Sequence, residues 1–201
     1  MEYFLLCALW ILWCFLHSFL VATKTTTKFK KQLGEKFAFY RIFYNLFSII
    51  TVLPLLYWQS TIPGPIIIAL SPFLVICKYI LLASGVIVIA GSFASIDIRE
   101  FIGIRQKVYG DQQKEKETVI SKRGLYGIVR HPMYFGGIIF FAASMTGAPL
   151  PQFLGYLILA IYMIIGTVRE DRRLSRELGA VYRNYQKEVP MILPMIPGRK
   201  N

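Results

Sequence analysis

Long apolar segments alternate with three cationic stretches along this chain, and this alternation restricts the folds that are open to it. Residues 3–22 carry no charge and match the length of about 20 residues that a helix needs to cross a bilayer core. Four further apolar segments follow, over residues 40–59, 66–95, 133–149 and 153–168. We therefore predict an all-α integral membrane bundle of about five transmembrane helices, which forms a single domain over residues 1–201.

The composition agrees with a membrane protein. Hydrophobic residues make up 55% of the 201 residues and charged residues only 17%, whereas soluble domains carry about 25% charged residues. This composition excludes an ordinary soluble domain. It also excludes a disordered chain, because disordered chains have too few apolar residues to form a core.

The net charge of +12 comes almost entirely from the segments between the predicted helices. Of the 23 lysines and arginines, 22 lie within residues 24–41, 99–130 and 169–200. The positive-inside rule places these stretches, in the loops 23–39 and 97–131 and in the C-terminal tail, in the cytoplasm. It places the N-terminus and the uncharged turns 60–65 and 147–152 outside. The charge then reflects topology and contact with the lipid bilayer, and we expect no nucleic-acid partner. We expect Lys78, the remaining cation, to extend toward the outer surface.

Several kinds of site are excluded by the motifs that the sequence lacks. The glycines of residues 97–131 do not have the spacing of a dinucleotide-binding fingerprint, and no strand–turn–helix unit is predicted to hold one. No HExxH zinc motif is present, and two histidines are too few for a convincing metal cluster. We therefore predict no metal site.

Polar side chains occur inside the cytoplasmic ends of the first two predicted helices. His17 and Ser18 lie near the end of the first, and Arg41, Tyr44 and Asn45 lie near the start of the second. Polar groups within a membrane usually face the interior of the bundle. Two interpretations are open: these residues form hydrogen bonds between helices, or they line the floor of a cavity that faces the cytoplasm.

Two charged clusters are predicted to meet at the cytoplasmic face. Arg130-His131-Pro132 stands before the fourth helix, where proline favours the first helical turn. Residues 169–173 (REDRR) follow the fifth helix, which is joined to the fourth by a short outer turn. The clusters either begin and end helices only, or they form a site where a charged ligand meets an apolar partner.

The tail, residues 169–201, contains an amphipathic pattern. Its apolar members recur at helical spacing, at Leu174, Leu178, Val181, Tyr182 and Tyr185. This pattern predicts a C-terminal helix that lies in the membrane interface. Pro190 ends the pattern, because proline cannot continue a helix.

Two segments of this region together resemble a known family. The segment RGLYGIVRHPMYFGG (123–137), followed by residues 169–194, resembles the C-terminal core of the isoprenylcysteine carboxyl methyltransferase family, which includes membrane methyltransferases acting on phospholipids and small thiols. The earlier part, with His17-Ser18, Tyr40-Arg41 and FIGIRQ (101–106), is similar to bacterial members, including the methanethiol S-methyltransferase and denitrification-associated branches. The resemblance implies a multi-pass protein of a bacterial inner membrane, with residues 1–96 as an N-terminal three-helix part and residues 97–201 as the methyltransferase-like core.

The resemblance also implies S-adenosylmethionine as methyl donor, bound at the cytoplasmic face. By position, the donor site would comprise Val119, Ile120, Tyr126, His131, Pro132, Met133, Tyr134 and Glu170. We predict Arg130 and Arg169 as the catalytic residues. Arg130 and His131 can contact the carboxylate of the donor, which an arginine can bind through two hydrogen bonds. Aromatic rings such as Tyr126 or Tyr134 can contact the adenine or the cationic sulfonium.

One position departs from the pattern of the family. Glu170 matches the donor-binding glutamate of the family. Carboxyl methyltransferases carry an arginine four residues before this glutamate, where it holds the carboxylate of the substrate. Here that position is Gly166. Three acceptors are open, an isoprenylcysteine-type carboxylate, a small thiol or a lipid, and the glycine favours the small thiol or the lipid over the carboxylate. The alternatives to a methyltransferase are a non-catalytic membrane protein and an NADPH-dependent reductase related to sterol reductases.

Overall fold

The computed structural model describes residues 1–94 and 122–194, without the side chains of Glu35, Ala38 and Arg41. In these ranges the regular elements are all helices, and the connections between them contain one isolated bridge, between Ile66 and Pro149. The elements are α1 (Glu2–Val21), α2 (Thr23–Leu33), the 3-10 helix η1 (Gly34–Phe39), α3 (Tyr40–Thr61), α4 (Pro72–Phe93), the 3-10 helix η2 (Gly124–Gly127), α7 (Pro132–Met145) and α8 (Leu150–Glu188). The all-α prediction is confirmed.

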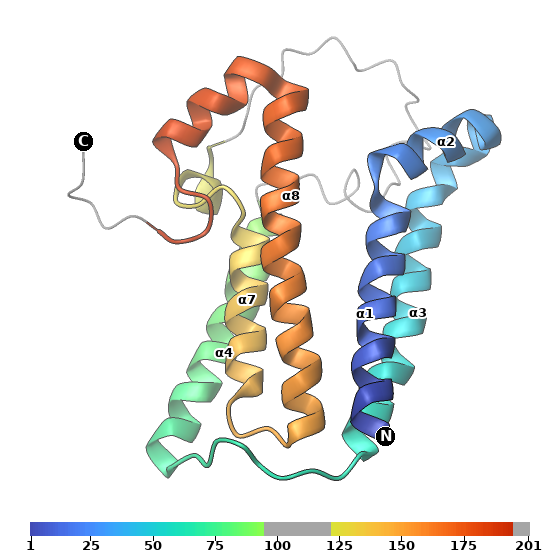
Figure 1. Cartoon of the computed structure of the whole chain (residues 1–201). Coiled ribbons are helices and arrows are strands. Elements are labelled where there is room, and N and C mark those ends of the chain that lie inside the picture. Colours follow the sequence, from blue (N-terminus) through green and yellow to red (C-terminus); the bar gives the residue numbers. More distant parts are fainter. Residues whose placement is uncertain (95–121, 195–201) are drawn as a thin grey trace.

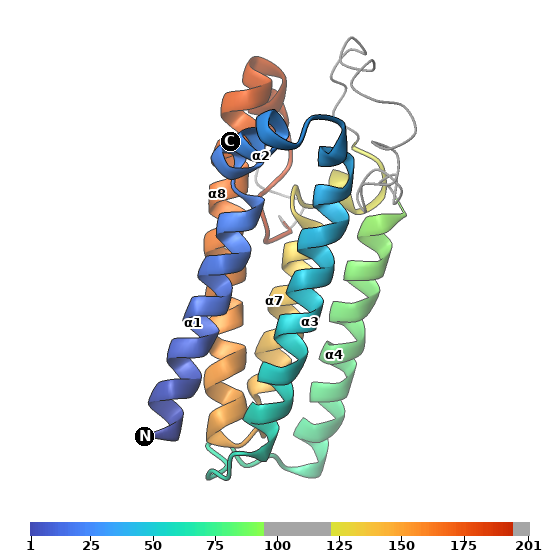
Figure 2. The same cartoon turned by 90° about the vertical axis from the view of Figure 1, so that its right-hand side faces the viewer.

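The long helices alternate in direction along one axis (Figure 1). The N-terminus and the connections α3–α4 and α7–α8 lie at one end of the bundle, while α2, η2 and the last third of α8 lie at the other. The described cationic segments therefore share one end, which we call the cationic end: it comprises residues 22–41, 122–131 and 169–194. The same arrangement is visible in the perpendicular view of Figure 2.

Four of the helices are long and apolar enough to cross a membrane: Glu2–Val21, Ile42–Thr61, Pro72–Phe93 and Leu150–Glu188. The fifth apolar helix, α7, has 14 residues. The third apolar segment was expected to form a helix from residue 66, but α4 begins only at Pro72, after Ser71, whose side chain accepts a hydrogen bond from the Leu74 amide. Residues 66–70 instead belong to the connection, where the Leu150 amide donates to the Pro65 carbonyl (2.9 Å).

Two expectations about the cationic segments are corrected. Residues 23–39 were expected to form a loop, yet they form α2 and η1, because no glycine or proline interrupts residues 23–33. The fifth helix was expected to end at residue 168, but α8 continues through the charged cluster to Glu188. It bends at Gly179, whose φ of 58° is accessible mainly to glycine.

A buried polar contact joins three helices in the half of the bundle away from the cationic end. The indole Nε1 of Trp10 donates to Oε1 of Gln59 (2.9 Å), and both side chains are fully buried beside Gly155 of α8. Leu6, Leu55 and Leu159 pack around this contact. The α1–α3 pair therefore contacts α8 in this half, and the ribbons of the pair and of α8 separate toward the cationic end (Figure 1).

Helices α4 and α7 approach closely through glycines. A Cβ on Gly85 would lie 2.9 Å from the carbonyl oxygen of Gly136, and a Cβ on Gly136 would lie 2.8 Å from that of Gly85. Small residues permit such close packing of membrane helices. Lys78 of α4 extends toward the α7–α8 turn, and its Nζ donates to the Thr146 carbonyl (2.7 Å) at the end of α7. These contacts hold α4 against α7, and α7 and α8 together form one wall of the cavity described below.

Candidate active site

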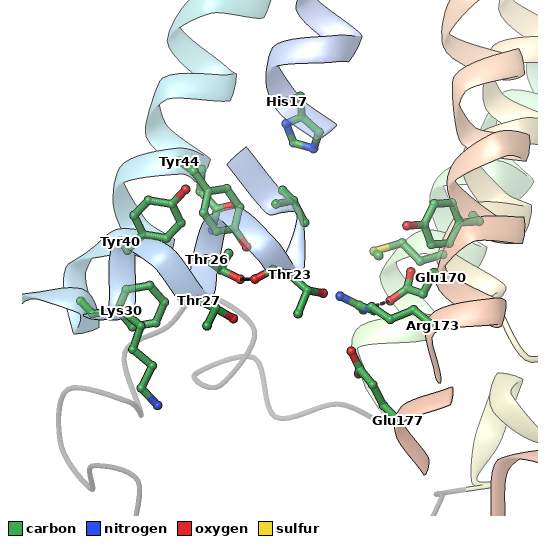
Figure 3. A pocket seen from close by; sticks show the side chains of 15 residues that line it. His17, Thr23, Thr26, Thr27, Lys30, Tyr40, Tyr44, Glu170, Arg173 and Glu177 are labelled. Carbon is green, nitrogen blue, oxygen red and sulfur yellow. Dashed lines mark hydrogen bonds and ion pairs between the residues drawn. The ribbon is translucent and has the colours of Figure 1, made fainter. Parts of the chain in front are cut away.

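A cavity of about 630 Å³ lies between the α1–α3 hairpin and the α7–α8 hairpin at the cationic end. Figure 3 shows the side chains that surround it. One wall is formed by His17, Val21, Thr23, Thr26, Thr27, Lys30, Phe37, Tyr40, Tyr44 and Asn45. The other wall is formed by Met133, Tyr134, Glu170, Arg173 and Glu177.

The charged groups of the second wall come from one face of α8. Glu170, Arg173 and Glu177 are spaced by three and four residues, so their side chains project from the same side of the helix. The Arg173 guanidinium donates to Glu170 Oε1 over 3.0 Å. The Nε of Arg173 is buried and has no hydrogen-bond partner among the described residues. This wall thus presents two carboxylates and an arginine with an unused donor.

Tyr134 connects this charged face to α7. Its hydroxyl lies close to the carboxylate of Glu170, and its ring packs against Gly166, where an added Cβ would lie 3.2 Å from Cε1 of the ring. An arginine at position 166 would therefore compete with the Tyr134 ring for the same space. Gly166 leaves the space that the Tyr134 ring occupies, and Tyr134 can therefore line the cavity.

The opposite wall is rich in hydroxyl groups and holds one imidazole. The hydroxyl of Tyr40 donates to the Leu20 carbonyl (2.9 Å), which fixes its ring between α1 and α3. The imidazole of His17 stacks on Trp13, with ring centroids 5.2 Å apart, and its Nδ1 lies 2.8 Å from the Ser48 Oγ. Figure 3 shows the His17 ring at the edge of the cavity, across from Glu170 and Arg173.

Asp171 faces away from the cavity and forms a buried polar cluster with the segment before α7. The Arg130 guanidinium donates to both of its oxygens, over 3.0 and 3.2 Å. The Tyr182 hydroxyl donates to Oδ1 (2.7 Å), and the Gln186 amide donates to Oδ2 (2.8 Å). His131 Nε2 lies 3.2 Å from Oδ1. We call these five residues the Asp171 cluster; it attaches the C-terminal segment to the start of α7.

Backbone contacts reinforce this attachment. The amides of Arg130 and His131 donate to the carbonyls of Pro190 (2.8 Å) and Met191 (3.2 Å). The Arg130 guanidinium also donates to the carbonyls of Gln186 and Val189, over 3.1 and 2.6 Å. The segment after Gly179 is therefore folded back along the beginning of α7, which is visible at the top of Figure 1.

The cluster also shifts the acidities of its members. Burial acts to raise the pKa of Asp171, but the hydrogen bonds from Tyr182, Arg130, His131 and Gln186 outweigh it, so the pKa of this carboxyl lies below its ordinary value. Burial and the Asp171 carboxylate together raise the pKa of the Tyr182 hydroxyl. Asp171 is therefore ionised and Tyr182 protonated at neutral pH.

The residues predicted for the site divide into three groups. Met133, Tyr134 and Glu170 line the cavity. Arg130 and His131 belong to the Asp171 cluster, and Pro132 is fully buried at the first turn of α7. Arg169 is exposed and is not among the residues that line the cavity.

Of the remaining predicted residues, Tyr126 is not among those that line the cavity. Tyr126 lies in η2, where burial, and then the nearby charges of Glu170 and Tyr185, raise the pKa of its hydroxyl to about 12. Its carbonyl accepts a hydrogen bond from the Tyr185 hydroxyl (2.5 Å). Val119 and Ile120 lie outside the described residues.

Several cavity residues were missed by the sequence analysis. Arg173 was read only as a member of the charged cluster 169–173, and Glu177 was not singled out, although their spacing from Glu170 indicates one helical face. Thr23, Thr26 and Thr27 were missed because their segment was taken for a loop. A metal is not suggested by the geometry, since the described residues contain no group of three His, Cys, Asp or Glu side chains that could hold one.

Comparison with known proteins relates this chain to membrane methyltransferases. The profile of the phospholipid methyltransferase family matches residues 79–180. A methanethiol S-methyltransferase of Pseudomonas deceptionensis is 45% identical over 78 residues, which are 36% of this chain and 27% of that protein. Proteins of the same name from Crocosphaera subtropica and Mycobacterium tuberculosis are 32% and 34% identical over 79% and 70% of this chain, and over 62% and 58% of their own lengths.

The matched region contains α7, the α7–α8 turn and most of α8, and so it includes the second wall of the cavity and much of the Asp171 cluster. The chain spans less than two thirds of the length of these curated relatives. No solved structure matches the chain significantly.

Proposed function

Because the chain belongs to the phospholipid methyltransferase family, we propose that it is an enzyme that transfers a methyl group from S-adenosylmethionine to a small thiol. It is an integral, multi-pass membrane protein. We place the cationic end in the cytoplasm and the protein in a bacterial inner membrane, since cytoplasmic loops carry the excess of Lys and Arg. The cavity then opens on the side where the donor is dissolved.

The donor's charges are matched by the second wall of the cavity. Glu170 and Glu177 can pair with the ammonium group or accept hydrogen bonds from the ribose hydroxyls. Arg173 has a buried Nε without a partner among the described residues, and this donor suits the carboxylate of the methionine part. The Tyr134 ring and the Met133 thioether suit the adenine ring and the sulfonium. The residues present therefore fit S-adenosylmethionine.

The size of the cavity also suits this function. Pockets for drug-sized ligands have volumes of about 300–1,000 Å³, and the cavity of about 630 Å³ lies in this range. When bound, S-adenosylmethionine supplies an electrophilic methyl group on a cationic sulfur. The protein contributes chiefly by positioning the two reactants and excluding water.

The roles of the predicted residues follow from their locations. Glu170, Arg173, Tyr134 and Met133 are binding residues in this proposal. Arg130 and His131 act as positioning residues, because their side chains are committed to Asp171 and hold α7 and α8 in register. We assign no catalytic role to Arg169, which is exposed and outside the cavity wall.

Two observations favour a small thiol as acceptor. Carboxyl methyltransferases carry at position 166 the arginine that binds the carboxylate of their substrate. Here the position is a glycine that packs against the Tyr134 ring, so it offers no cation to an acceptor carboxylate. Relatives that match 70–79% of the chain are named methanethiol S-methyltransferases. A lipid or a prenylcysteine carboxylate remains an outcome of the test.

The observation that carries the proposal is the charged face of Glu170, Arg173 and Glu177 on one wall of the cavity. The first experiment is calorimetry on the detergent-purified protein, in which we expect binding of S-adenosylmethionine and none of NADPH; the reverse would favour a reductase. The second supplies donor with a labelled methyl group together with methanethiol, phospholipid or prenylcysteine. We expect label in the thiol product, and label in none of the three would contradict the proposal.

A further inference from the structure

The hydrogen bonds around His17 determine which of its two ring nitrogens carries the proton. The Ser48 hydroxyl donates its single hydrogen to the carbonyl of Tyr44 over 2.7 Å. The same oxygen lies 2.8 Å from His17 Nδ1. Since this hydrogen is already used, the Ser48 oxygen accepts the hydrogen bond, and Nδ1 of His17 is the donor.

A neutral imidazole has one N–H group, so a proton on Nδ1 leaves a lone pair on Nε2. Within the described part of the chain, no hydrogen-bond partner is found for this nitrogen. His17 is one of the residues that line the cavity. The ring is held in this orientation by its stack on Trp13 and by an edge contact with Tyr162, whose ring centroid is 6.2 Å away.

The geometry points to His17 as the general base that removes the proton of the thiol acceptor, an inference that rests on the proposed function. Its position suits this role, because His17 comes from the wall opposite Glu170 and Arg173, which are assigned to the donor (Figure 3). A small acceptor between the two walls would have a basic nitrogen on one side and the methyl group on the other. His17 thus fits both interpretations of the polar residues in the first two predicted spans. Its Nδ1 joins α1 to α3 through Ser48, and its ring lines the cavity.

The step balances without a further reactant. The S–H bond of the acceptor breaks and its proton passes to His17 Nε2. The electron pair of the acceptor sulfur forms the new S–CH₃ bond. The bond between the methyl group and the sulfonium breaks, and its electron pair stays on the donor sulfur. The proton then leaves Nε2 through the cavity, so the imidazole returns to its neutral form.

The substitution His17→Asn tests this role, because the side-chain amide of Asn retains a donor near the Nδ1 position and lacks a nitrogen base at the Nε2 position. For ethanethiol, which is protonated at neutral pH, we expect kcat/KM to fall by about 100-fold, within the usual range for loss of a general base. For thiophenol, which is already ionised at neutral pH, no proton has to be removed. We therefore expect a change of less than about threefold with this acceptor.

Tyr3→Phe is the matched control. It removes the hydrogen bond from the Tyr3 hydroxyl to the Pro63 carbonyl (2.8 Å), which also involves α1 but lies at the other end of the bundle and does not touch the cavity. We expect it to leave both thiols within about threefold of the wild type. If His17→Asn slows ethanethiol and thiophenol equally, or slows neither, the role as base is overturned.

A second measurement does not depend on turnover. The chain contains two histidines, so ¹⁵N-histidine labelling gives two sets of ring signals, and His17→Asn identifies one of them. We expect His17 to carry its proton on Nδ1 at neutral pH and Ser48→Ala to weaken this preference. A proton on Nε2 in the wild type would overturn the inference. A wild-type protein that methylates neither thiol would overturn the proposed function and this inference with it.

Discussion

Glu170 and Asp171 are neighbours in the sequence, yet their carboxylates face two different parts of the molecule. Glu170 lines the cavity and accepts a hydrogen bond from Arg173, whereas Asp171 is buried against Arg130, His131 and Tyr182. Successive residues of an α-helix point about 100° apart. A single turn of α8 therefore supplies both the charged wall of the site and the anchor that holds the C-terminal segment against α7.

The first prediction concerns donor binding. We expect Glu170→Gln to weaken the binding of S-adenosylmethionine by roughly 10- to 100-fold, because a charge-assisted hydrogen bond contributes about 1.5–3 kcal/mol. Calorimetry on the purified protein measures this change. Glu188→Gln is the matched control on the same helix, since Glu188 forms an ion pair with Lys122 at the surface. Equal affinities for the wild type and Glu170→Gln would remove Glu170 from the donor site.

The second prediction concerns stability. We expect Asp171→Asn to destabilise the fold by about 3 kcal/mol, because removal of one partner leaves the Arg130 charge buried without compensation. The loss should be concentrated in residues 180–194, which are attached through this cluster. Thermal unfolding together with limited proteolysis measures both effects. An unchanged melting temperature and an unchanged cleavage pattern would contradict the anchoring role of Asp171.

The third prediction concerns acid. The Asp171 carboxyl has a lower pKa in the folded protein than in the unfolded chain, so the folded state binds this proton less readily. Its contribution to stability is therefore complete above the ordinary carboxyl pKa of about 3.9 and is lost as the pH falls through the depressed value. We expect the acid-induced loss of stability below about pH 4 to be smaller in Asp171→Asn than in the wild type. The free energy of unfolding is measured against pH for both proteins, from neutral to acidic pH. Parallel curves for the wild type and Asp171→Asn would contradict this prediction.

The fourth prediction concerns Gly166. A Cβ at this position would lie 3.2 Å from Tyr134 Cε1, so we expect Gly166→Ala to be tolerated after a shift of a few tenths of an ångström. Gly166→Arg should displace the Tyr134 ring and weaken the binding of S-adenosylmethionine by about tenfold, or about 1.4 kcal/mol. Calorimetry of both variants separates the two effects. If the arginine variant binds the donor as well as the wild type does, Tyr134 is not part of the donor site.

The sequence by itself determined the membrane character of the chain and the common location of its cationic segments. Apolar length and the positions of 22 of 23 cations are one-dimensional properties, and a bilayer converts them directly into spans and sides. The inclusion of Met133, Tyr134 and Glu170 in one site also followed, through the resemblance of residues 123–137 and 169–194 to a known family.

Only the tertiary structure decided which charged residues face the cavity. Arg130 and His131 were expected to contact the donor, but Asp171, 41 and 40 residues further along the chain, takes their hydrogen bonds. No local pattern reveals such pairing, because it depends on how α7 and α8 cross and on the bend at Gly179. The same holds for His17, whose proton is placed by Ser48 on another helix: its chemistry follows from the packing of α1 against α3 rather than from its neighbours in sequence.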